Sequence, residues 1–255
     1  MQADRSDLIL KEKNLYKSFI ILALPVFGVN MLMSMNDLID TYFIGQMPNS
    51  VAAQAGMSIS WPLINILMAF NIGLAVAGVA IISQLLGAGN KKAAQKYSGM
   101  LILFSTILGI FINLILFLIT PTVIGWMGAT GEVYSSSVIY VQTRSFELVF
   151  TFIFASFQSI RQARGDTITP VALSALGILV NVILNGVFIQ GLGMGVFGAA
   201  LATVISQVIK VPFCIYFLFV QKTEYRVRRA DLKIDLPCIY KLTKVALPSA
   251  GSQAF

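Results

Sequence analysis

Residues 41–90 read TYFIGQMPNSVAAQAGMSISWPLINILMAFNIGLAVAGVAIISQLLGAGN and contain no charged side chain. A helix that crosses the hydrocarbon core of a membrane needs about 20 mostly apolar residues. The stretch is therefore long enough for the end of one such helix, a turn and a complete second helix. The turn is predicted at residues 45–50, GQMPNS, because Gly, Pro, Asn and Ser favour turns. This part of the chain is expected to lie in lipid.

Other stretches lack charge in the same way, at residues 18–36, 97–131 and 167–209. Clusters of Gly and Pro interrupt them at residues 120–128 and 191–195, where we expect turns. The pattern predicts an all-α integral membrane protein with a bundle of six transmembrane helices. The expected spans are residues 15–45, 55–86, 96–121, 134–160, 168–190 and 197–221.

The composition agrees with this fold class. Hydrophobic residues make up 57% of the chain and charged residues 11%, whereas a soluble domain has about 45–50% and about 25%. These values exclude a soluble domain, a disordered chain and a nucleic-acid-binding domain. The chain has no histidine, which excludes imidazole acid–base catalysis and His-ligated metal sites. We expect neither an enzyme nor a cofactor, and we interpret Cys214 and Cys238 as ordinary free thiols.

Basic residues are confined to alternate connections between the expected helices. Nearly all of the 18 Lys and Arg lie in the N-terminal tail, in the loops at residues 91–96 and 161–164, and in the tail from Lys222. Connections rich in Lys and Arg usually face the cytoplasm. We therefore expect a multi-pass protein of the inner (plasma) membrane with both ends of the six-helix unit in the cytoplasm. The net charge of +7 then requires no nucleic-acid partner.

A short internal echo suggests the domain organisation. Ala23-Leu24-Pro25 with Gly28 recurs as Ala246-Leu247-Pro248 with Gly251. The echo is either a coincidence in a biased composition or the start of a second copy of the unit, and parallel repeats are common in transporters. The second interpretation predicts a six-helix lobe at 1–221, a cytoplasmic linker at 222–238 and the first helix of a second lobe at 239–255.

Two acidic residues, Asp37 and Asp40, lie late in the first expected span and share one face of the helix. A carboxylate inside the membrane costs about 2.5–3.5 kcal/mol on insertion scales, so it usually faces a cavity and is functional. The alternative is that both residues lie at the outer interface and contact water.

Other polar residues also fall inside expected spans. Asn181 and Asn185 stand one turn apart in the fifth span, and they are either interhelical contacts or an ion or proton site. Arg144 and Glu147 in the fourth span are spaced to neutralise each other, in a structural pair or a coupling pair. Lys210 in the sixth span is expected to extend its ammonium group towards the cytoplasmic interface.

Short motifs in a fixed order resemble the N-terminal half of a multidrug and toxic compound extrusion (MATE) transporter, most closely of the DNA-damage-inducible F (DinF) branch. The resemblance covers essentially the whole chain. The motifs are Ala23-Leu24-Pro25, Asp40-Thr41-Tyr42-Phe43-Ile44-Gly45, Gly87-Ala88-Gly89-Asn90-Lys91-Lys92-Ala93, Gly165-Asp166-Thr167 with Pro170, Asn181, and Gly198-Ala199-Ala200-Leu201-Ala202-Thr203.

The resemblance implies one lobe of a twelve-helix transporter, whose second lobe follows in the same polypeptide or comes from a second copy. It implies that Asp40 is the coupling carboxylate. The residues that it implies around Asp40 for the coupling ion are Asn36, Asn181, Asn185 and Thr203, with Asp37, Arg144 and Glu147 as secondary candidates. The residues expected in the substrate cavity are Asn30, Met33, Ser34 and Gln158, and Pro25 is expected at a bend, fixed or moving, in the first helix.

The coupling ion is expected to be a proton, with Na+ near Asp40 as the alternative. Many prokaryotic members of the family carry an aspartate where this chain has Asn185. Hard cations favour several oxygen ligands with charge, so the lost carboxylate weakens the case for Na+.

The expected function is the export of amphipathic, often cationic drugs or toxic metabolites in exchange for this ion. Two alternatives stay open. One is a lipid-linked oligosaccharide flippase of the related superfamily, for which a cavity rich in cationic residues would be expected, and Arg144 is the obvious candidate. The other is a non-transporting half-length membrane scaffold.

Overall fold

The computed structural model describes residues 50–221 and 235–254, the segment 38–47, and the short pieces 27–28, 31, 34–35, 227–228 and 231–232. The described secondary structure is helical and contains no strand, which confirms the predicted all-α fold. The main helices are α3 (Ser50–Gly87), α4 (Lys91–Trp126), α5 (Gly131–Ala163), α6 (Ile168–Asn185), α7 (Gly195–Ile215) and α8 (Leu236–Ala254). Two π-helical turns, η1 (Gly186–Gly191) and η2 (Tyr216–Val220), extend α6 and α7.

Five of the described helices are long and apolar enough to cross a membrane. They are Ala53–Gly87, Lys91–Trp126, Gly131–Ala163, Ile168–Gly191 and Gly195–Val220. These helices match the second to sixth spans expected from the charge pattern. Most of the first expected span and the basic N-terminal tail lie outside the described residues, so the count of six and the sidedness stay predictions.

Glycines and polar caps end the helices where the sequence indicated turns. Gly89 has a φ of +72°, and the Asn90 side chain accepts a hydrogen bond from Ala93 N at 3.1 Å at the start of α4. Gly165 has a φ of +81°, and Asp166 Oδ1 accepts a hydrogen bond from Thr169 N at 3.1 Å at the start of α6. Positive φ angles favour glycine, which explains the placement of these residues.

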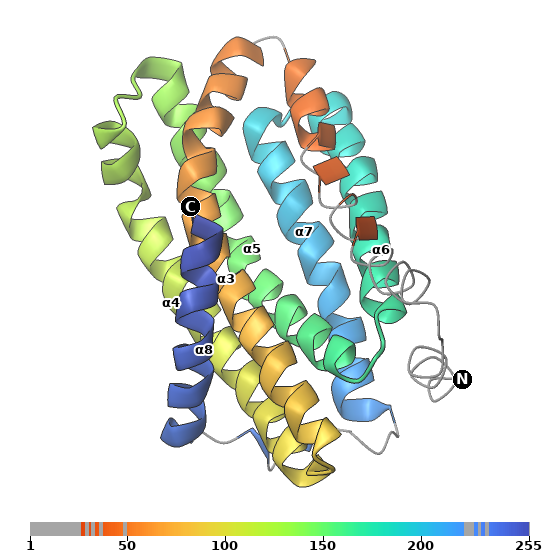
Figure 1. Cartoon of the computed structure of the whole chain (residues 1–255). Coiled ribbons are helices and arrows are strands. Elements are labelled where there is room, and N and C mark those ends of the chain that lie inside the picture. Colours follow the sequence, from red (N-terminus) through yellow and green to blue (C-terminus); the bar gives the residue numbers. More distant parts are fainter. Residues whose placement is uncertain are drawn as a thin grey trace.

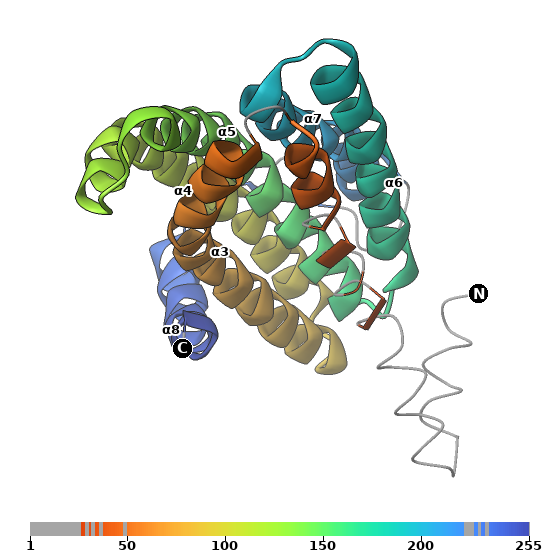
Figure 2. The same ribbon diagram turned by 90° about the horizontal axis from the view of Figure 1, so that it is seen from above.

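Helix α5 runs through the centre of the molecule, and it contacts α3, α4 and α7 (Figures 1 and 2). The segment 38–45 lies beside α6 and α7, on the other side of the bundle from α4 and α8. Large apolar side chains such as Phe111 and Leu118 on α4 are exposed on the outside. This arrangement is that of a membrane bundle whose outer face contacts lipid.

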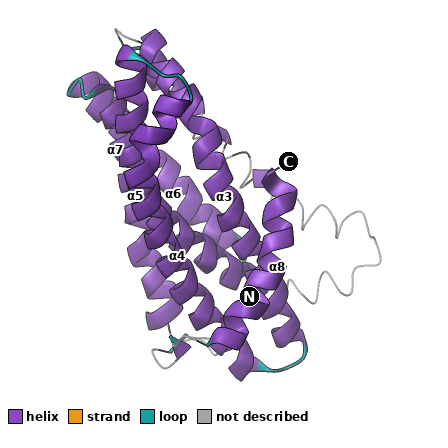
Figure 3. Ribbon diagram, turned by 90° about the vertical axis from the view of Figure 1, so that its left-hand side faces the viewer, coloured by secondary structure: helices purple, strands orange, loops and turns teal. Residues whose placement is uncertain are grey.

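Helix α8 packs along the outside of α3 (Figures 1 and 3). A Cβ atom on Gly73 would lie 2.5 Å from Ala246 O, so the two backbones come this close only because residue 73 is glycine. Leu242 of α8 joins the core cluster that includes Leu101 of α4. The predicted start of a second lobe at residue 239 therefore coincides with a docked helix, although its identity as a repeat stays a prediction.

The connections alternate between the two ends of the bundle (Figure 1). Residues 87–91 and 163–168 lie at one end, hereafter the basic end because Lys91, Lys92 and Arg164 are found there. The connections at 126–131 and 191–195 lie at the opposite, neutral end. This geometry agrees with the alternation of charge along the sequence.

Candidate functional site

The structure brings together four of the polar residues singled out from the sequence. Asp40 lies on the helical segment 38–45, Asn181 and Asn185 lie one turn apart on α6, and Thr203 lies on α7. All four side chains are buried, with at most 1% exposed. Hereafter these residues are the Asp40 cluster.

Hydrogen bonds connect the cluster in a closed arrangement. Asn185 Nδ2 donates to Asp40 Oδ1 at 2.7 Å and to Asn181 Oδ1 at 2.9 Å. Asn181 Nδ2 donates to Thr203 Oγ1 at 3.3 Å. Thr203 Oγ1 lies 3.2 Å from Asp40 Oδ2 and 3.1 Å from the carbonyl oxygen of Ala199. Each carboxylate oxygen of Asp40 therefore has a partner.

The Thr203 hydroxyl has one proton and two acceptors within reach. When Asp40 is ionised, this proton is donated to Asp40 Oδ2. When Asp40 is protonated, its own O–H can donate to Thr203 Oγ1, and the hydroxyl proton turns to the carbonyl of Ala199. The site can therefore accommodate both protonation states with only a rotation of the hydroxyl group.

One acceptor in the cluster is unused. Asn185 Oδ1 is buried and has no hydrogen-bond partner among the described residues. A buried acceptor without a partner costs about 1–3 kcal/mol. This oxygen is available to a proton donor or a cation that enters beside Asp40.

A second buried polar group lies on α5. Arg144 Nη2 donates to Glu147 Oε1 at 2.7 Å, and Arg144 Nη1 donates to the hydroxyl of Tyr140 at 2.8 Å. The ion pair predicted from the spacing of Arg144 and Glu147 is thus confirmed. Arg144 Nε and Glu147 Oε2 are buried and lack partners among the described residues.

A cavity of about 300 Å³ lies between α3, α5, α6 and α7, hereafter the inner cavity. Its volume is at the lower end of the range for small-molecule sites. Thr203 lines this cavity and also contacts Asp40, so it connects the two polar groups. The other lining residues that carry polar or aromatic side chains are Trp61, Asn65, Asn71, Arg144, Glu147, Thr151, Phe154, Ser174, Ser206, Gln207 and Lys210.

The position predicted for the Lys210 ammonium group at the interface was wrong. Lys210 is 6% exposed, its Nζ lies 4.1 Å from the centre of the Phe154 ring, and it lines the inner cavity. The stem passes α6 at Gly177, where a Cβ atom would lie 3.1 Å from Lys210 Cδ. The ring face attracts the cation and the glycine leaves room for its stem, so the side chain turns inward.

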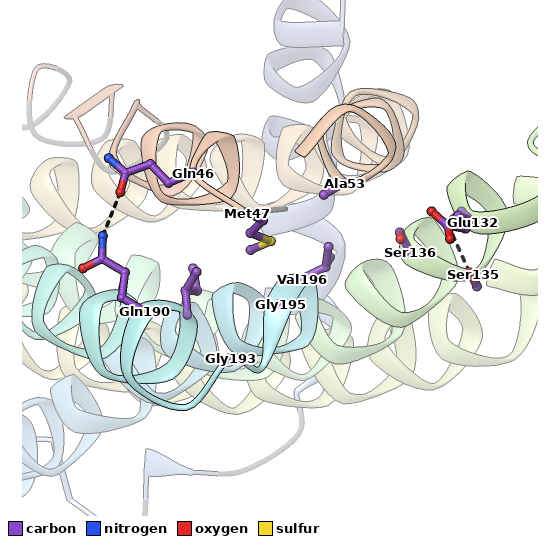
Figure 4. Close-up of a pocket in the computed structure, with 11 residues that line it drawn as sticks. Gln46, Met47, Ala53, Glu132, Ser135, Ser136, Gln190, Gly193, Gly195 and Val196 are labelled. Atoms are coloured by element: carbon purple, nitrogen blue, oxygen red, sulfur yellow. Dashed lines mark hydrogen bonds between the residues drawn. The ribbon is translucent and has the colours of Figure 1, made fainter. Parts of the chain in front are cut away.

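A larger cavity of about 880 Å³ opens at the neutral end of the bundle, hereafter the outer cavity (Figure 4). Gln46 and Gln190 line it and are joined by a hydrogen bond of 2.9 Å, and Glu132 lines it from α5. Gln46 follows Asp40 by six residues, about 9 Å along a helix. The outer cavity thus lies within two helical turns of the Asp40 cluster.

The structure does not bring all of the predicted residues into these sites. Ser34 is exposed and Gln158 is half-buried, and neither lines the inner or the outer cavity. The remaining predicted residues lie outside the described part of the chain; these are Pro25, Asn30, Met33, Asn36 and Asp37.

Several cavity residues were not singled out from the sequence. Asn65 and Asn71 interrupt the apolar run of α3, which is a signal that the charge pattern alone does not use. Gln207 lies on α7 at helical spacing between Thr203 and Lys210, which were singled out, so a search for polar stripes would have found it as well.

Nothing in the described part of the chain forms a group of three or more His, Cys, Asp and Glu that could hold a metal ion. The Asp40 cluster offers several oxygen atoms but one carboxylate. Such a set fits a proton better than a hard cation, which favours several charged oxygen ligands.

Comparison with known proteins relates the chain to one family of membrane transporters. Residues 25–187 match the family model described as MatE. The chain is 29% identical to the multidrug export protein MepA of Staphylococcus haemolyticus, over 96% of the chain and 54% of MepA. It is also 29% identical to the probable multidrug resistance protein NorM of Thermotoga maritima, over 92% of the chain and 51% of NorM. The chain therefore spans about half the length of these relatives.

A solved structure shares this fold. It is a MOP superfamily transporter from Pyrococcus furiosus, described as having a binding pocket of reverse polarity that suggests a different function. The TM-score is 0.86 at 26% sequence identity, and the match covers 96% of this chain and 54% of the other.

Proposed function

The chain belongs to the MATE family of membrane transporters, which are not enzymes, and from this premise we propose that it forms the ion-coupled lobe of a multidrug exporter. In this proposal the transporter lies in the inner (plasma) membrane, with the basic end in the cytoplasm. It expels small amphipathic compounds, often cationic, in exchange for protons. The assignment to the DinF branch is part of the proposal.

One observation carries it: Asp40 is a fully buried carboxyl group whose two oxygens are held by Asn185 and Thr203. A buried carboxyl group in a membrane bundle is costly, and such groups usually mark ion or proton pathways. The Thr203 hydroxyl can serve the ionised and the protonated acid in turn. The cluster therefore has the properties of a site that gains and loses one proton.

Exchange follows from the charge of Asp40. The ionised carboxylate attracts a cationic group of the substrate in the neighbouring inner cavity, and a proton at Asp40 removes this attraction. Each ligand then weakens the binding of the other, and this reciprocity is required for coupling. The proposal includes a second effect, in which the neutral acid lets the first helix repack against α6 and α7, with Pro25 at the bend.

The outer cavity is the proposed route of the proton. Its residue Gln46 lies in the turn directly after the helical segment that carries Asp40, and the hydrogen bond to Gln190 connects this turn to η1. Opening this contact would connect Asp40 to water at the neutral end. Acidification of the outside would then load the site.

The test is Asp40→Asn in the full-length protein, because the amide has the shape of the acid but cannot exchange a proton. We expect the variant to lose export of the cationic dye ethidium driven by an imposed pH gradient, measured in everted membrane vesicles. Asp235→Asn is the matched control, since it makes the same change at a partly exposed position at the basic end. Gradient-driven export by Asp40→Asn at the wild-type rate, at equal protein in the membrane, would overturn the proposal.

A second lobe is part of the proposed transporter. The lobe boundaries 1–221, 222–238 and 239–255 are retained as its domain plan, with α8 as the first helix of the second lobe. That lobe would follow in the same polypeptide or be supplied by a second copy. The proposed transporter also requires a lipid bilayer, in agreement with the exposed apolar side chains of α4.

One observation favours the alternative of a lipid-linked oligosaccharide flippase. Lys210 joins Arg144 in the inner cavity, and the related Pyrococcus furiosus transporter is described by a pocket of reverse polarity. Arg144 is already paired with Glu147, however, so one ammonium group remains without an anionic partner among the described residues. A single spare cation suits an acidic group on a small compound better than the large polyanionic head of a lipid-linked oligosaccharide.

A further inference from the structure

We propose that Lys210 forms a subsite in the inner cavity that binds an acidic group of the exported compound. The preferred substrates are then amphipathic zwitterions, with an acidic group at Lys210 and a cationic group towards Asp40. This inference rests on the proposed function and adds the substrate class to it.

Lys210 is a buried cation without an anionic partner among the described residues. Its Nζ lies 4.1 Å from the centre of the Phe154 ring, and within the described ranges it makes no hydrogen bond and no ion pair. Glu147 lines the same cavity but is bound to Arg144. An ammonium group removed from water costs several kcal/mol unless it is paired. An acidic group on a ligand would supply the missing partner.

The surrounding cavity has other unused polar atoms. Buried atoms without partners in the described part of the chain include Arg144 Nε, Glu147 Oε2, Thr151 Oγ1 and Gln207 Oε1, and all four residues line the inner cavity. Native interiors leave few such atoms, and those that remain often mark a place for a ligand, an ion or water. Four such atoms belong to residues that line one cavity, and this concentration favours a ligand site over a packing defect.

The formal charges set the type of ligand. Arg144, Glu147 and Lys210 together give the inner cavity one net positive charge, and the ionised Asp40 behind Thr203 contributes one negative charge. Thr203 and Lys210 are seven residues apart on α7, about 10 Å along the helix. The cavity thus presents an anion-binding end and a cation-binding end, and a zwitterion matches both.

A zwitterion bound in this way is still compatible with the proposed exchange of substrate for a proton. The cationic group of the substrate lies on the side of Asp40, so that protonation of Asp40 weakens its binding. The acidic group lies at Lys210, away from the titrating site, and fixes orientation and selectivity. A purely cationic compound can still bind on the side of Asp40, but it lacks the contact at Lys210 and is expected to bind less tightly than the zwitterion.

The test compares a rhodamine dye that carries a free carboxylic acid with the methyl ester of the same dye, using the full-length protein. The two probes differ by one charge and share their ring system. Binding is measured by fluorescence anisotropy on purified protein, and export is measured separately in everted vesicles. We expect Lys210→Met to lower the ratio of acid to ester affinity by roughly tenfold or more, because a charge-assisted contact is lost.

Lys241→Met is the matched control. Lys241 also lies near an aromatic ring, with its Nζ 5.9 Å from the centre of Tyr97, but it lies on α8 and does not line the inner cavity. We expect its acid-to-ester ratio to equal that of the wild type. An unchanged ratio in Lys210→Met, or binding of neither dye by the wild type, would overturn the subsite.

The two proposals fail in different ways. Selective, Lys210-dependent binding of the acid dye without pH-driven export would uphold the subsite and overturn the export function. Export of both dyes at equal rates that does not depend on Lys210 would do the reverse. Displacement of the acid dye by phosphatidylglycerol, with no export of the dye, would assign the subsite to a lipid phosphate and overturn the substrate class.

Discussion

The Asp40 cluster and the inner cavity share Thr203, but they differ in how far their buried polar groups are paired. In the Asp40 cluster each carboxylate oxygen has a hydrogen-bond partner, and one acceptor, Asn185 Oδ1, has none among the described residues. In the inner cavity the charged group at Lys210 contacts a ring, and four polar atoms of the lining residues have no partner in the described part of the chain. A closed network suits an ion as small as a proton, whereas an open one suits a ligand that brings its own polar groups.

In the proposed mechanism, this difference keeps the proton site and the substrate site separate within one lobe. Both carboxylate oxygens of Asp40 accept hydrogen bonds, and the four side chains of the cluster are buried. The inner cavity has a volume of about 300 Å³ and an incomplete set of partners. The shared Thr203 places the two sites close enough for charge to act between them, because the interior screens charge weakly.

The largest effect is expected from Glu147→Gln, which leaves Arg144 as an unpaired buried charge. Removal of one member of a buried ion pair costs about 3–5 kcal/mol. We expect a clear drop in the melting temperature of the purified protein and in its amount in the membrane. Because Arg144 is then free of its anion, any remaining folded protein should also bind the acid dye more tightly than the ester.

The double variant Arg144→Met/Glu147→Leu is the control for this effect. Replacement of a buried pair by apolar residues of similar volume is often neutral or stabilising. We therefore expect the melting temperature to recover. If Glu147→Gln and the double variant are equally unstable, the ion pair is not what holds this part of α5.

An intermediate effect is expected from Asn185→Asp, which makes the closed cluster more like a cation site. Asn185 Nδ2 lies 2.7 Å from Asp40 Oδ1, so the substitution would place two carboxyl groups side by side. Hard cations favour such paired carboxylates. We expect an imposed Na+ gradient to drive dye export by the variant, by roughly twofold or more over the wild-type response.

Asn185→Ser serves as the uncharged control and is expected to show no gain with Na+. A wild-type protein that already responds fully to Na+ would contradict the assignment of the proton as coupling ion. Activity of the variants is compared at equal amounts in the membrane.

The smallest effect is expected at the partly exposed ion pair between Lys96 and Asp235 at the basic end, which contrasts with the buried pair on α5. The hydrogen bond from Lys96 lowers the pKa of Asp235 below its usual value. A lowered pKa in the folded state gives stability that is present above about pH 4 and is lost as the pH falls through the lowered pKa. Asp235→Asn should therefore melt slightly below the wild type at pH 7, and the two should converge in acid, because surface pairs contribute little. A difference that persists in acid would contradict this.

Much of the fold could be predicted because a helix that lies in lipid has an apolar composition, which can be recognised in the sequence. The charge-free run at residues 41–90 and its counterparts predicted the long helices to within a few residues, as for α6 with η1, expected at 168–190 and found at 168–191. The packing partner of α8 could not be predicted. It depends on the close approach of α8 to Gly73. A single glycine in an apolar stretch does not indicate which helix will pack against it.

The sequence by itself determined that the chain is a bundle of membrane helices, because its long stretches without charge suit lipid. It also singled out Asp40, Asn181, Asn185 and Thr203 as polar residues inside the expected spans, and it left open whether Asp40 is buried or meets water. Only the tertiary structure decided which of these polar groups meet. It placed Asn185 and Thr203 on the two oxygens of Asp40, and it turned Lys210 inward onto Phe154. The hydropathy of a residue depends on that residue alone. Whether a polar or charged side chain finds a partner depends on the residues of the neighbouring helices, and helix packing decides which residues these are.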